Sequence, residues 1–230
     1  MMILDFLRNR FAREAFHPSI ISIVTSPVYI IRSGLYSGIR QLSPLITGNV
    51  LDFGCGSKPY ETLFRNATSY TGVDINQSGH DHINSRIDVF YDGKKLPFVD
   101  NHFDAVVSFE VLEHIFNINE VLAEINRVMK PGGLILITIP FAWEEHEVPC
   151  DFARYTSYGI RHVVQASNFE VIEIKKSTTY FLAIAQMLIA YLAHYILPRS
   201  PALRRLLQII VIFPINLMSL TINALLPKRL

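Results

Sequence analysis

The sequence has little cysteine and no excess of charge of either sign, and these two shortages exclude several classes of protein. Its two cysteines, Cys55 and Cys150, predict no disulfide framework and fit a reducing compartment. Neither cysteine has the spacing of a zinc site, and we predict no metal site from the sequence. The 21 lysines and arginines balance 20 acidic residues, which gives no electrostatic reason to expect a nucleic-acid partner.

The N-terminus does not have the pattern of a cleaved signal peptide, because three arginines precede Glu14 without a clean apolar run behind them. Hydrophobic residues make up 50% of the chain, and the excess is concentrated in its last fifth. We therefore expect a cytoplasmic protein with a local apolar segment near its C-terminus.

Residues 50–60, Val-Leu-Asp-Phe-Gly-Cys-Gly-Ser-Lys-Pro-Tyr, are typical of a buried strand that ends at a glycine turn before a helix. Gly54 and Gly56 allow a sharp turn close to a ligand. A dinucleotide-binding turn has a third glycine where this chain has Pro59, which also lacks an N–H for a phosphate. We expect Asp52, before the first glycine, to face the ligand, which suits a cationic amine or sulfonium.

Strand and helix patterns alternate after this turn and predict an α/β fold, a Rossmann-like, mostly parallel sheet flanked by helices. We expect a helical preface at 1–44, this α/β domain at 45–178 and an apolar helical tail at 179–230. The expected strands are Val50–Phe53, Tyr70–Ile75, Ile87–Tyr91, Phe103–Phe109, Leu134–Ile139 and Glu170–Lys175. The expected helices are Pro59–Asn66, Asn119–Lys130 and Ser157–Ser167, and residues 76–86 are expected to form a loop.

Acidic residues follow the predicted strands in a regular order. Asp74 closes the second strand about 20 residues after the turn, where an acid can bind both ribose hydroxyls of a nucleoside; a helix cap or a surface acid is the alternative. Asp92–Phe98 and Glu110–His114 come next. In order and spacing, these segments resemble class I S-adenosylmethionine-dependent methyltransferases of the type 11 kind, including those that methylate quinone precursors. The resemblance covers about residues 50–140.

The resemblance implies a methyltransferase with S-adenosylmethionine as its cofactor. It implies that Asp52, Gly54 and Gly56 cradle the amino-acid end of the cofactor. Asp74 is implied to hold the ribose, and Asp92 to read the adenine amino group. The backbone carbonyls of Phe109 and Glu110 are implied to hold the methionine amino group. The implied cofactor-binding residues are Asp52, Gly54, Gly56, Asp74, Asp92, Phe109 and Glu110.

The segment 140–155 follows the fifth predicted strand, where class I methyltransferases place acceptor-binding residues. His146 is a candidate general base because its unperturbed pKa is near neutrality, and His114 is the second candidate. The alternatives are a helix-cap role for His114 and an acceptor that needs no base. The acceptor-binding candidates are Trp143, Glu147, Asp151, Arg154 and Tyr155, although Asp151 and Arg154 can instead form a salt bridge within the loop.

The sequence of this segment resembles that of bacterial methyltransferases associated with cell-surface polysaccharide or lipid-linked glycan synthesis. This resemblance implies a small-molecule or lipid-linked glycan acceptor. Two other interpretations fit parts of the sequence. The first is a non-catalytic membrane-associated module that retains the fold. The second is the Tyr-x-x-x-Lys pair of short-chain reductases at Tyr91 and Lys95, which Gly93 and a proline-containing turn interrupt, so we treat this pair as a coincidence.

Two segments of the tail, Tyr180–Leu197 and Leu206–Leu226, approach the ~20 apolar residues that span a bilayer. A spanning hairpin would place Arg204 and Arg205 on the translocated side, against the positive-inside bias. Because each segment also has a thin polar stripe, we expect contact through residues 180–226 at the inner face of the membrane; a soluble helical cap and true spanning are the alternatives. These apolar residues occupy the place of the usual final antiparallel strand, so the sheet is either one strand short or unusually paired.

Overall fold

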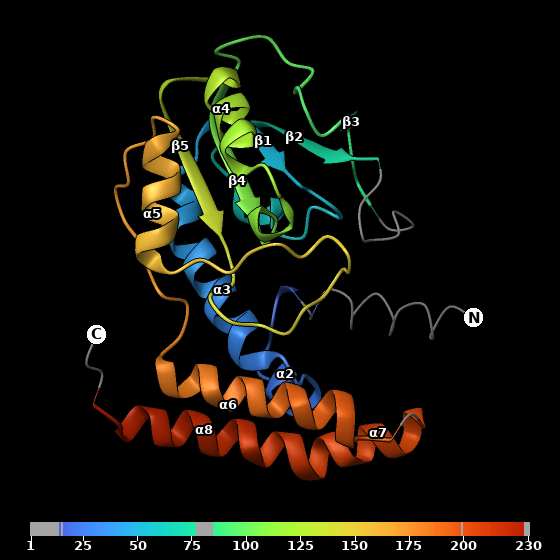
Figure 1. The fold of residues 1–230 in the computed structure, drawn as a ribbon. Coiled ribbons are helices and arrows are strands. Elements are labelled where there is room, and N and C mark those ends of the chain that lie inside the picture. The colour runs from blue at the N-terminus through green and yellow to red at the C-terminus, as the bar shows by residue number, and fades with distance from the viewer. Residues whose placement is uncertain (1–13, 15, 77–84, 199, 228–230) are drawn as a thin grey trace. The chain divides into compact units, whose positions relative to one another are not determined.

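The computed structural model describes residues 14, 16–76, 85–198 and 200–227. The chain divides into two compact units (Figure 1): an α/β unit, Arg40–Ile174, and a helical unit made of Met1–Ile39 and Lys175–Leu230. Residues 1–13 and 15 of the predicted N-terminal segment and most of the predicted loop 76–86 lie outside the described residues, and the predicted three-part division of the chain stays a prediction.

The α/β unit contains a five-stranded sheet with the order β3-β2-β1-β4-β5, in which all neighbouring strands are parallel. The strands are β1 (Gly48–Phe53), β2 (Ala67–Ile75), β3 (Val89–Tyr91), β4 (Phe103–Phe109) and β5 (Met129–Thr138). The Rossmann-like class is therefore confirmed. The strand order reverses between β1 and β4, and open α/β sheets bind ligands beside such a reversal, at the carboxyl ends of the strands.

Two amphipathic helices, α4 (Ile118–Val128) and α5 (Ser157–Ala166), cover one face of this sheet (Figure 1). Strands β1, β2 and β4 contribute Leu51, Phe53, Val73, Phe103 and Val106 to this core. Burying each large apolar side chain stabilises the fold by roughly 1.5–3 kcal/mol. The core includes Leu51, Phe53, Val73, Val106, Leu122, Ile125 and Val164.

Two expected elements are absent from the described part of the α/β unit. The predicted helix Pro59–Asn66 is a single 3₁₀ turn, Glu61–Leu63, because Lys58 has a left-handed backbone (φ 53°) and the Phe64 ring stacks on Phe109. The predicted strand Glu170–Lys175 has no strand pairing, and Phe169 and Val171 pack against the helix-covered core instead. The sheet therefore ends at β5 in the described residues.

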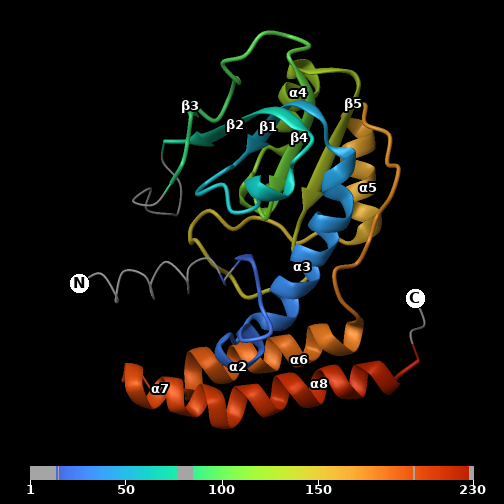
Figure 2. The same cartoon turned by 180° about the vertical axis from the view of Figure 1, so that it is seen from behind.

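The helical unit contains α2 (Ser22–Thr25), most of α3 (Tyr29–Leu42), α6 (Tyr180–Tyr191), α7 (Pro201–Leu207) and α8 (Phe213–Leu225). π-Helical turns extend α6 to Ile196 and join α7 to α8. In both views, α6 and α8 lie side by side (Figures 1 and 2). Their contact is apolar, with Ile189, Ala193 and Ile212 fully buried.

One polar residue of each stripe, Gln186 and Asn216, is buried and bonded to backbone, whereas His194 of the first stripe is exposed. The side-chain amide of Gln186 donates to the carbonyl of Pro27 at 2.7 Å and accepts from the N–H of Ile31 at 3.2 Å. The Asn216 amide donates to the carbonyls of Ile23 and Ser26 at 3.0 and 3.2 Å. These two amides thus bind backbone inside the unit, and the outer surface of the helices is mostly apolar.

Candidate functional site

The glycine turn after β1 is tied to β2 by its backbone. The N–H groups of Gly54 and Cys55 both donate to the carbonyl of Val73, at 2.9 and 3.2 Å. The N–H of Gly56 donates to Oδ2 of Asp74 at 3.0 Å. These three N–H groups are therefore bonded within the fold, and a 3₁₀ turn follows in place of an α-helix. The turn does not form the amide cradle that a pyrophosphate requires.

Asp74 lies half-buried at the end of β2 and connects the turn to the strand. Its Oδ2 accepts from Gly56, and its Oδ1 accepts from the N–H of Ile75 at 2.8 Å. A carboxylate oxygen has a second lone pair, so both oxygens retain acceptor capacity. This geometry is compatible with two ribose hydroxyls, the contact predicted from the sequence.

Asp52 lies beneath the turn, where its side chain is only 2% exposed. Its Oδ2 accepts from the hydroxyl of Tyr70 at 2.8 Å. Burial raises the pKa of Asp52 to about 7, against the opposing effects of the Tyr70 hydrogen bond and the Lys58 ammonium, and the Asp74 carboxylate adds to the rise. The fold thus encloses the side chain of Asp52, and its predicted contact with the cofactor stays a prediction.

Asp92 follows β3 and is exposed. Its Oδ1 accepts from the N–H groups of Lys95 and Lys94, at 3.0 and 2.9 Å, and these bonds lower the pKa of the carboxyl group. Because β1, β2 and β3 are parallel neighbours, Asp52, Asp74 and Asp92 lie along one edge of the sheet. The three carboxylates predicted from the sequence therefore share this edge.

Phe109 and Glu110, the predicted cofactor-binding residues at the end of β4, have different surroundings. The Phe109 ring packs edge-on against Tyr60, with centroids 5.0 Å apart, and stacks on Phe64. Glu110 has a left-handed backbone (φ 55°), and its N–H donates to the carbonyl of Thr138 at 3.0 Å. Strained backbone of this kind in non-glycine residues is frequent at functional sites.

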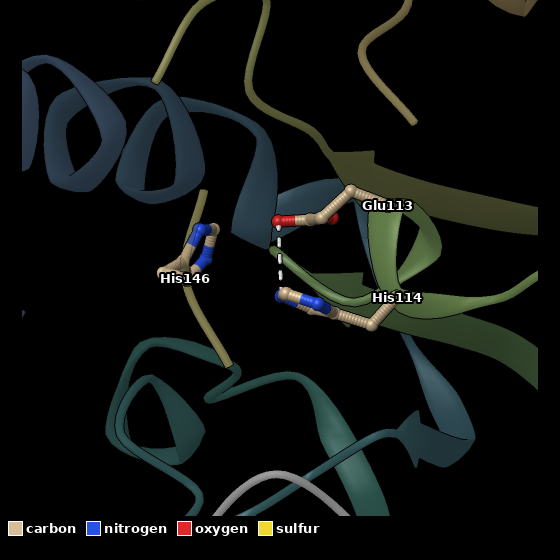
Figure 3. Close-up of side chains that lie close together, drawn as sticks. All are labelled: Glu113, His114 and His146. Atoms are coloured by element: carbon tan, nitrogen blue, oxygen red, sulfur yellow. Dashed lines mark ion pairs between the residues drawn. The ribbon is translucent and has the colours of Figure 1, made fainter. Parts of the chain in front are cut away.

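A second cluster forms where the turn after β4 meets the loop after β5. Glu113 and His114 end the 3₁₀ turn Leu112–His114, and His146 lies in the loop (Figure 3). The rings of His114 and His146 are 4.8 Å apart, edge to face. His114 Nε2 lies 3.8 Å from Glu113 Oε1 and 3.7 Å from Glu147 Oε1. The structure thus unites both histidines predicted as candidate bases.

Glu113 was not predicted from the sequence, although it is the most buried acid of this cluster, with 1% exposure. Neither of its carboxyl oxygens has a hydrogen-bond partner in the described residues. Burial, with the Glu110 carboxylate as a smaller cause, raises the pKa of Glu113 to about 8. The one signal in the sequence for a functional role of Glu113 was its position next to His114. The sequence alone does not show which of the glutamates near His114 is buried.

The loop is held by Asp151 and Arg154. The Asp151 carboxylate accepts from Arg154 Nη2 at 2.7 Å and from the backbone N–H of His146 at 3.0 Å. The Arg154 guanidinium holds the pKa of Asp151 well below its usual range. Of the other predicted acceptor residues, Tyr155 packs against the core and Trp143 is half-buried. The salt bridge weighed as an alternative for Asp151 and Arg154 is therefore present.

Known proteins similar to this chain share its fold and its motif region. A family model described as a methyltransferase domain matches residues 31–208. The ubiquinone/menaquinone biosynthesis C-methyltransferase of Burkholderia mallei (strain SAVP1) is 34% identical over 111 residues, covering 43% of this chain and 46% of that protein. This chain therefore spans about half the length of the curated relatives that it matches.

Two solved structures show the likeness in fold alone. An S-adenosylmethionine-dependent methyltransferase from Mesorhizobium loti has a TM-score of 0.52 at 15% identity, over 70% of this chain and 93% of that chain. The [4+2]-cyclase SpnF has a TM-score of 0.50 at 22% identity, over 80% and 76% of the two chains. Because one of these two is named as a cyclase, the reaction has to be argued from the site.

Proposed function

Because this chain belongs to the methyltransferase domain family, we propose that it transfers a methyl group to a small-molecule or lipid-linked glycan acceptor. Its class I fold uses S-adenosylmethionine, which supplies an activated methyl group on a sulfonium. The observation that carries the proposal is the edge of the sheet, where Asp52, Asp74 and Asp92 lie beside a turn without free phosphate-binding amides. A cationic nucleoside suits this edge better than a pyrophosphate.

We assign the cofactor contacts from this edge. Gly56 leaves open space beside the turn, because a Cβ added there meets no heavy atom of the described residues within 4 Å. The amino-acid end of the cofactor fits this space, and the carboxylate of Asp74 accepts from the ribose hydroxyls. Asp92 keeps acceptor capacity for an exocyclic amino group, since only its Oδ1 bonds its own turn.

On the acceptor side, His146 is assigned as the group that takes a proton from the acceptor. Its Nδ1 faces two acceptors, the carbonyl of Glu144 at 3.2 Å and the carboxylate of Asp151 at 3.3 Å. Arg154 Nη2, a donor, also lies 3.4 Å from Nδ1. Because both acceptors lie closer than this donor, we assign the hydrogen to Nδ1, which leaves the lone pair on Nε2, the atom needed for general-base catalysis. Asp151 is a positioning residue, since it also binds the backbone N–H of His146.

Replacement of Asp74 by alanine tests the ribose assignment. We expect Asp74→Ala to weaken S-adenosylmethionine binding about 10- to 100-fold, through loss of hydrogen bonds worth ~1–3 kcal/mol. Calorimetry on the full chain measures this effect, with Asp100→Ala, an exposed carboxylate elsewhere in the α/β unit, as the control. Since Asp74 also holds Gly56, the 2′-deoxy cofactor analogue separates the two roles.

If Asp74 binds the ribose, the wild-type chain loses affinity for the 2′-deoxy analogue, and the variant distinguishes less between the two ligands. Equal losses for both ligands would mean that Asp74 acts only by ordering the turn. A wild-type chain that binds neither S-adenosylmethionine nor S-adenosylhomocysteine would instead support the non-catalytic module.

We further propose that the helical unit contacts the cytoplasmic face of a bilayer. In the described residues, one helix, Pro201–Leu225, is long and apolar enough to cross a membrane, with a mean hydropathy of 1.8 and 17% of its most apolar stretch buried. The exposed side chains of this helix are apolar except Arg205 and Thr221, and Asn216 points inward. A largely apolar outer surface suits lipid better than water.

The helix pair is better suited to lie in one leaflet than to span. Tyr180–Ile196 is about 25 Å long at 1.5 Å per residue, which is shorter than the ~30 Å hydrocarbon core. Lys175 and Lys176 precede α6, and Arg204 and Arg205 lie at the opposite end of the hairpin, so both ends carry positive charge. Anionic head groups on one side of the bilayer satisfy both ends.

Vesicle flotation of the full chain tests this contact. We expect the wild type to float with vesicles that contain phosphatidylglycerol, and the double variant Ile210→Asp/Met218→Asp to stay in the aqueous fraction. Both side chains are more than half exposed, so the charges do not disturb the core. Tyr158→Asp, at an exposed position on α5, is the control and should float like the wild type. Flotation of the double variant at the wild-type level would refute the lipid contact.

A further inference from the structure

Three side chains in the second cluster present metal-binding atoms to one another. Glu113, His114 and His146 each offer one ligand atom, and these atoms lie within 4.8 Å of one another (Figure 3). They come from two segments that are separated in the sequence, the turn after β4 and the loop after β5. We propose that these three residues bind a divalent transition-metal ion of the zinc type.

The hydrogen bonds of the two histidines leave the correct nitrogens available. His114 Nδ1 lies 2.7 Å from the carbonyl of Cys150, so this nitrogen carries the hydrogen and Nε2 keeps its lone pair. We assign the same pattern to His146, because its Nδ1 lies 3.2 Å from the Glu144 carbonyl and 3.3 Å from the Asp151 carboxylate, closer than the donor Arg154 Nη2 at 3.4 Å. A metal-bound histidine commonly donates its second N–H to a carbonyl or a carboxylate, which fixes the orientation of the ring.

Glu113 gives an independent indication of a bound cation. Its side chain is fully enclosed, and no hydrogen bond to either carboxyl oxygen exists within the described residues. Its Oε1 lies 3.8 Å from the available Nε2 of His114. Buried carboxyl groups are usually hydrogen-bonded, paired with a charge or bound to a metal ion. An ion between Glu113 and the two histidines would satisfy this carboxylate.

The donor set also identifies the class of ion. Two imidazoles and one carboxylate suit zinc and its neighbours in the first transition series, whereas magnesium and calcium prefer oxygen ligands. Zinc bonds of about 2.0–2.1 Å in a tetrahedron separate the ligand atoms by about 3.3 Å, so the side chains must move together by roughly 1 Å. Three protein ligands leave a fourth position open, as catalytic zinc sites do.

An ion in this position deepens the proposed function, and this part of the inference depends on that function. The open position can bind an acceptor oxygen, and the ion can then lower the pKa of that oxygen, so that His146 is a ligand and no longer the base. Metal binding itself does not depend on the identity of the acceptor.

Metal binding by the full chain tests the inference. After chelator treatment and dialysis against Zn²⁺, we expect one zinc ion per chain by mass spectrometry of the elements, and a visible four-coordinate spectrum with Co²⁺. His146→Ala and Glu113→Gln should each weaken zinc affinity at least tenfold. His162→Ala removes an exposed histidine of α5 and should bind zinc like the wild type.

Circular dichroism and S-adenosylmethionine binding in the same samples distinguish the ways in which the experiment can fail. A folded wild-type chain that binds S-adenosylmethionine but retains no zinc overturns the metal site and leaves the proposed function intact. Equal zinc affinity in the wild type and both folded cluster variants also overturns it. Tenfold or greater loss in both variants, with an unaffected His162→Ala control, supports the assignment.

Discussion

Gly56→Ala is expected to weaken S-adenosylmethionine binding roughly 100-fold, a change of about 2.7 kcal/mol, while the chain remains folded. The added methyl group enters the open space that we assign to the amino-acid end of the cofactor. Its effect on folding is small, because a left-handed backbone at φ +45° costs an alanine only about 1–2 kcal/mol. Calorimetry with S-adenosylmethionine and urea unfolding of the same samples measure the two effects.

Two other glycines provide matched controls for this prediction. Gly132 has φ +77° and equally open surroundings at the start of β5, so Gly132→Ala should lose similar stability and keep full cofactor affinity. Gly54→Ala is the opposite case, since its Cβ would lie 2.5 Å from both γ-carbons of Val111. We expect that variant to lose about 2–4 kcal/mol of folding free energy. Wild-type cofactor affinity in Gly56→Ala would remove the cradle assignment.

Asp52 is expected to make the stability of the chain fall as pH rises from about 4 to 7. The pKa of its carboxyl group is about 7 in the folded chain and near 4 in the unfolded chain, so the folded state binds the proton more tightly over this window. The stabilisation is fully present below pH 4 and is lost as pH rises through 7. A shift of about three units corresponds to roughly 4 kcal/mol.

The neutral variant Asp52→Asn isolates this contribution, because it keeps an oxygen that can accept from the hydroxyl of Tyr70. Urea unfolding at pH 4, 6 and 8 should show a smaller decrease in the variant than in the wild type, by an amount that approaches ~4 kcal/mol. Asp100→Asn, at a largely exposed position, should retain the wild-type decrease. Parallel curves for the wild type and Asp52→Asn would show that Asp52 ionises like an exposed carboxyl group.

The proposed cofactor contact and the proposed lipid contact require surfaces of different charge and polarity. The edge of the sheet concentrates carboxylates, which attract a cation, whereas the helical unit has an apolar outer surface with positively charged ends. A lipid-linked acceptor joins these features chemically, because its anchor remains in the bilayer while its polar part is accessible to an enzyme on the same surface. Flotation and cofactor binding test the two parts separately.

Sequence pattern predicted the local elements whose periodicity is strong. The alternation of strands and helices, and the glycine turn after Phe53, gave five of the six predicted strands and the two amphipathic helices. Pattern failed where packing competes with propensity. Residues 59–66 have a capping serine and an early proline, yet the aromatic contacts of Tyr60 and Phe64 replace the helix with one 3₁₀ turn.

By itself, the sequence determined that an acid lies at or just after the end of each of the first three strands, because strand pattern and side-chain type are local properties. Only the tertiary structure decided which way those acids point: Asp52 lies beneath the turn against Tyr70, while Asp74 remains beside it. It alone joined Glu113 and His114 to His146, since those segments meet only after β5 has paired with β4. It also turned Gln186 and Asn216 inward, because the backbone carbonyls near α2 require donors that only folding brings within reach.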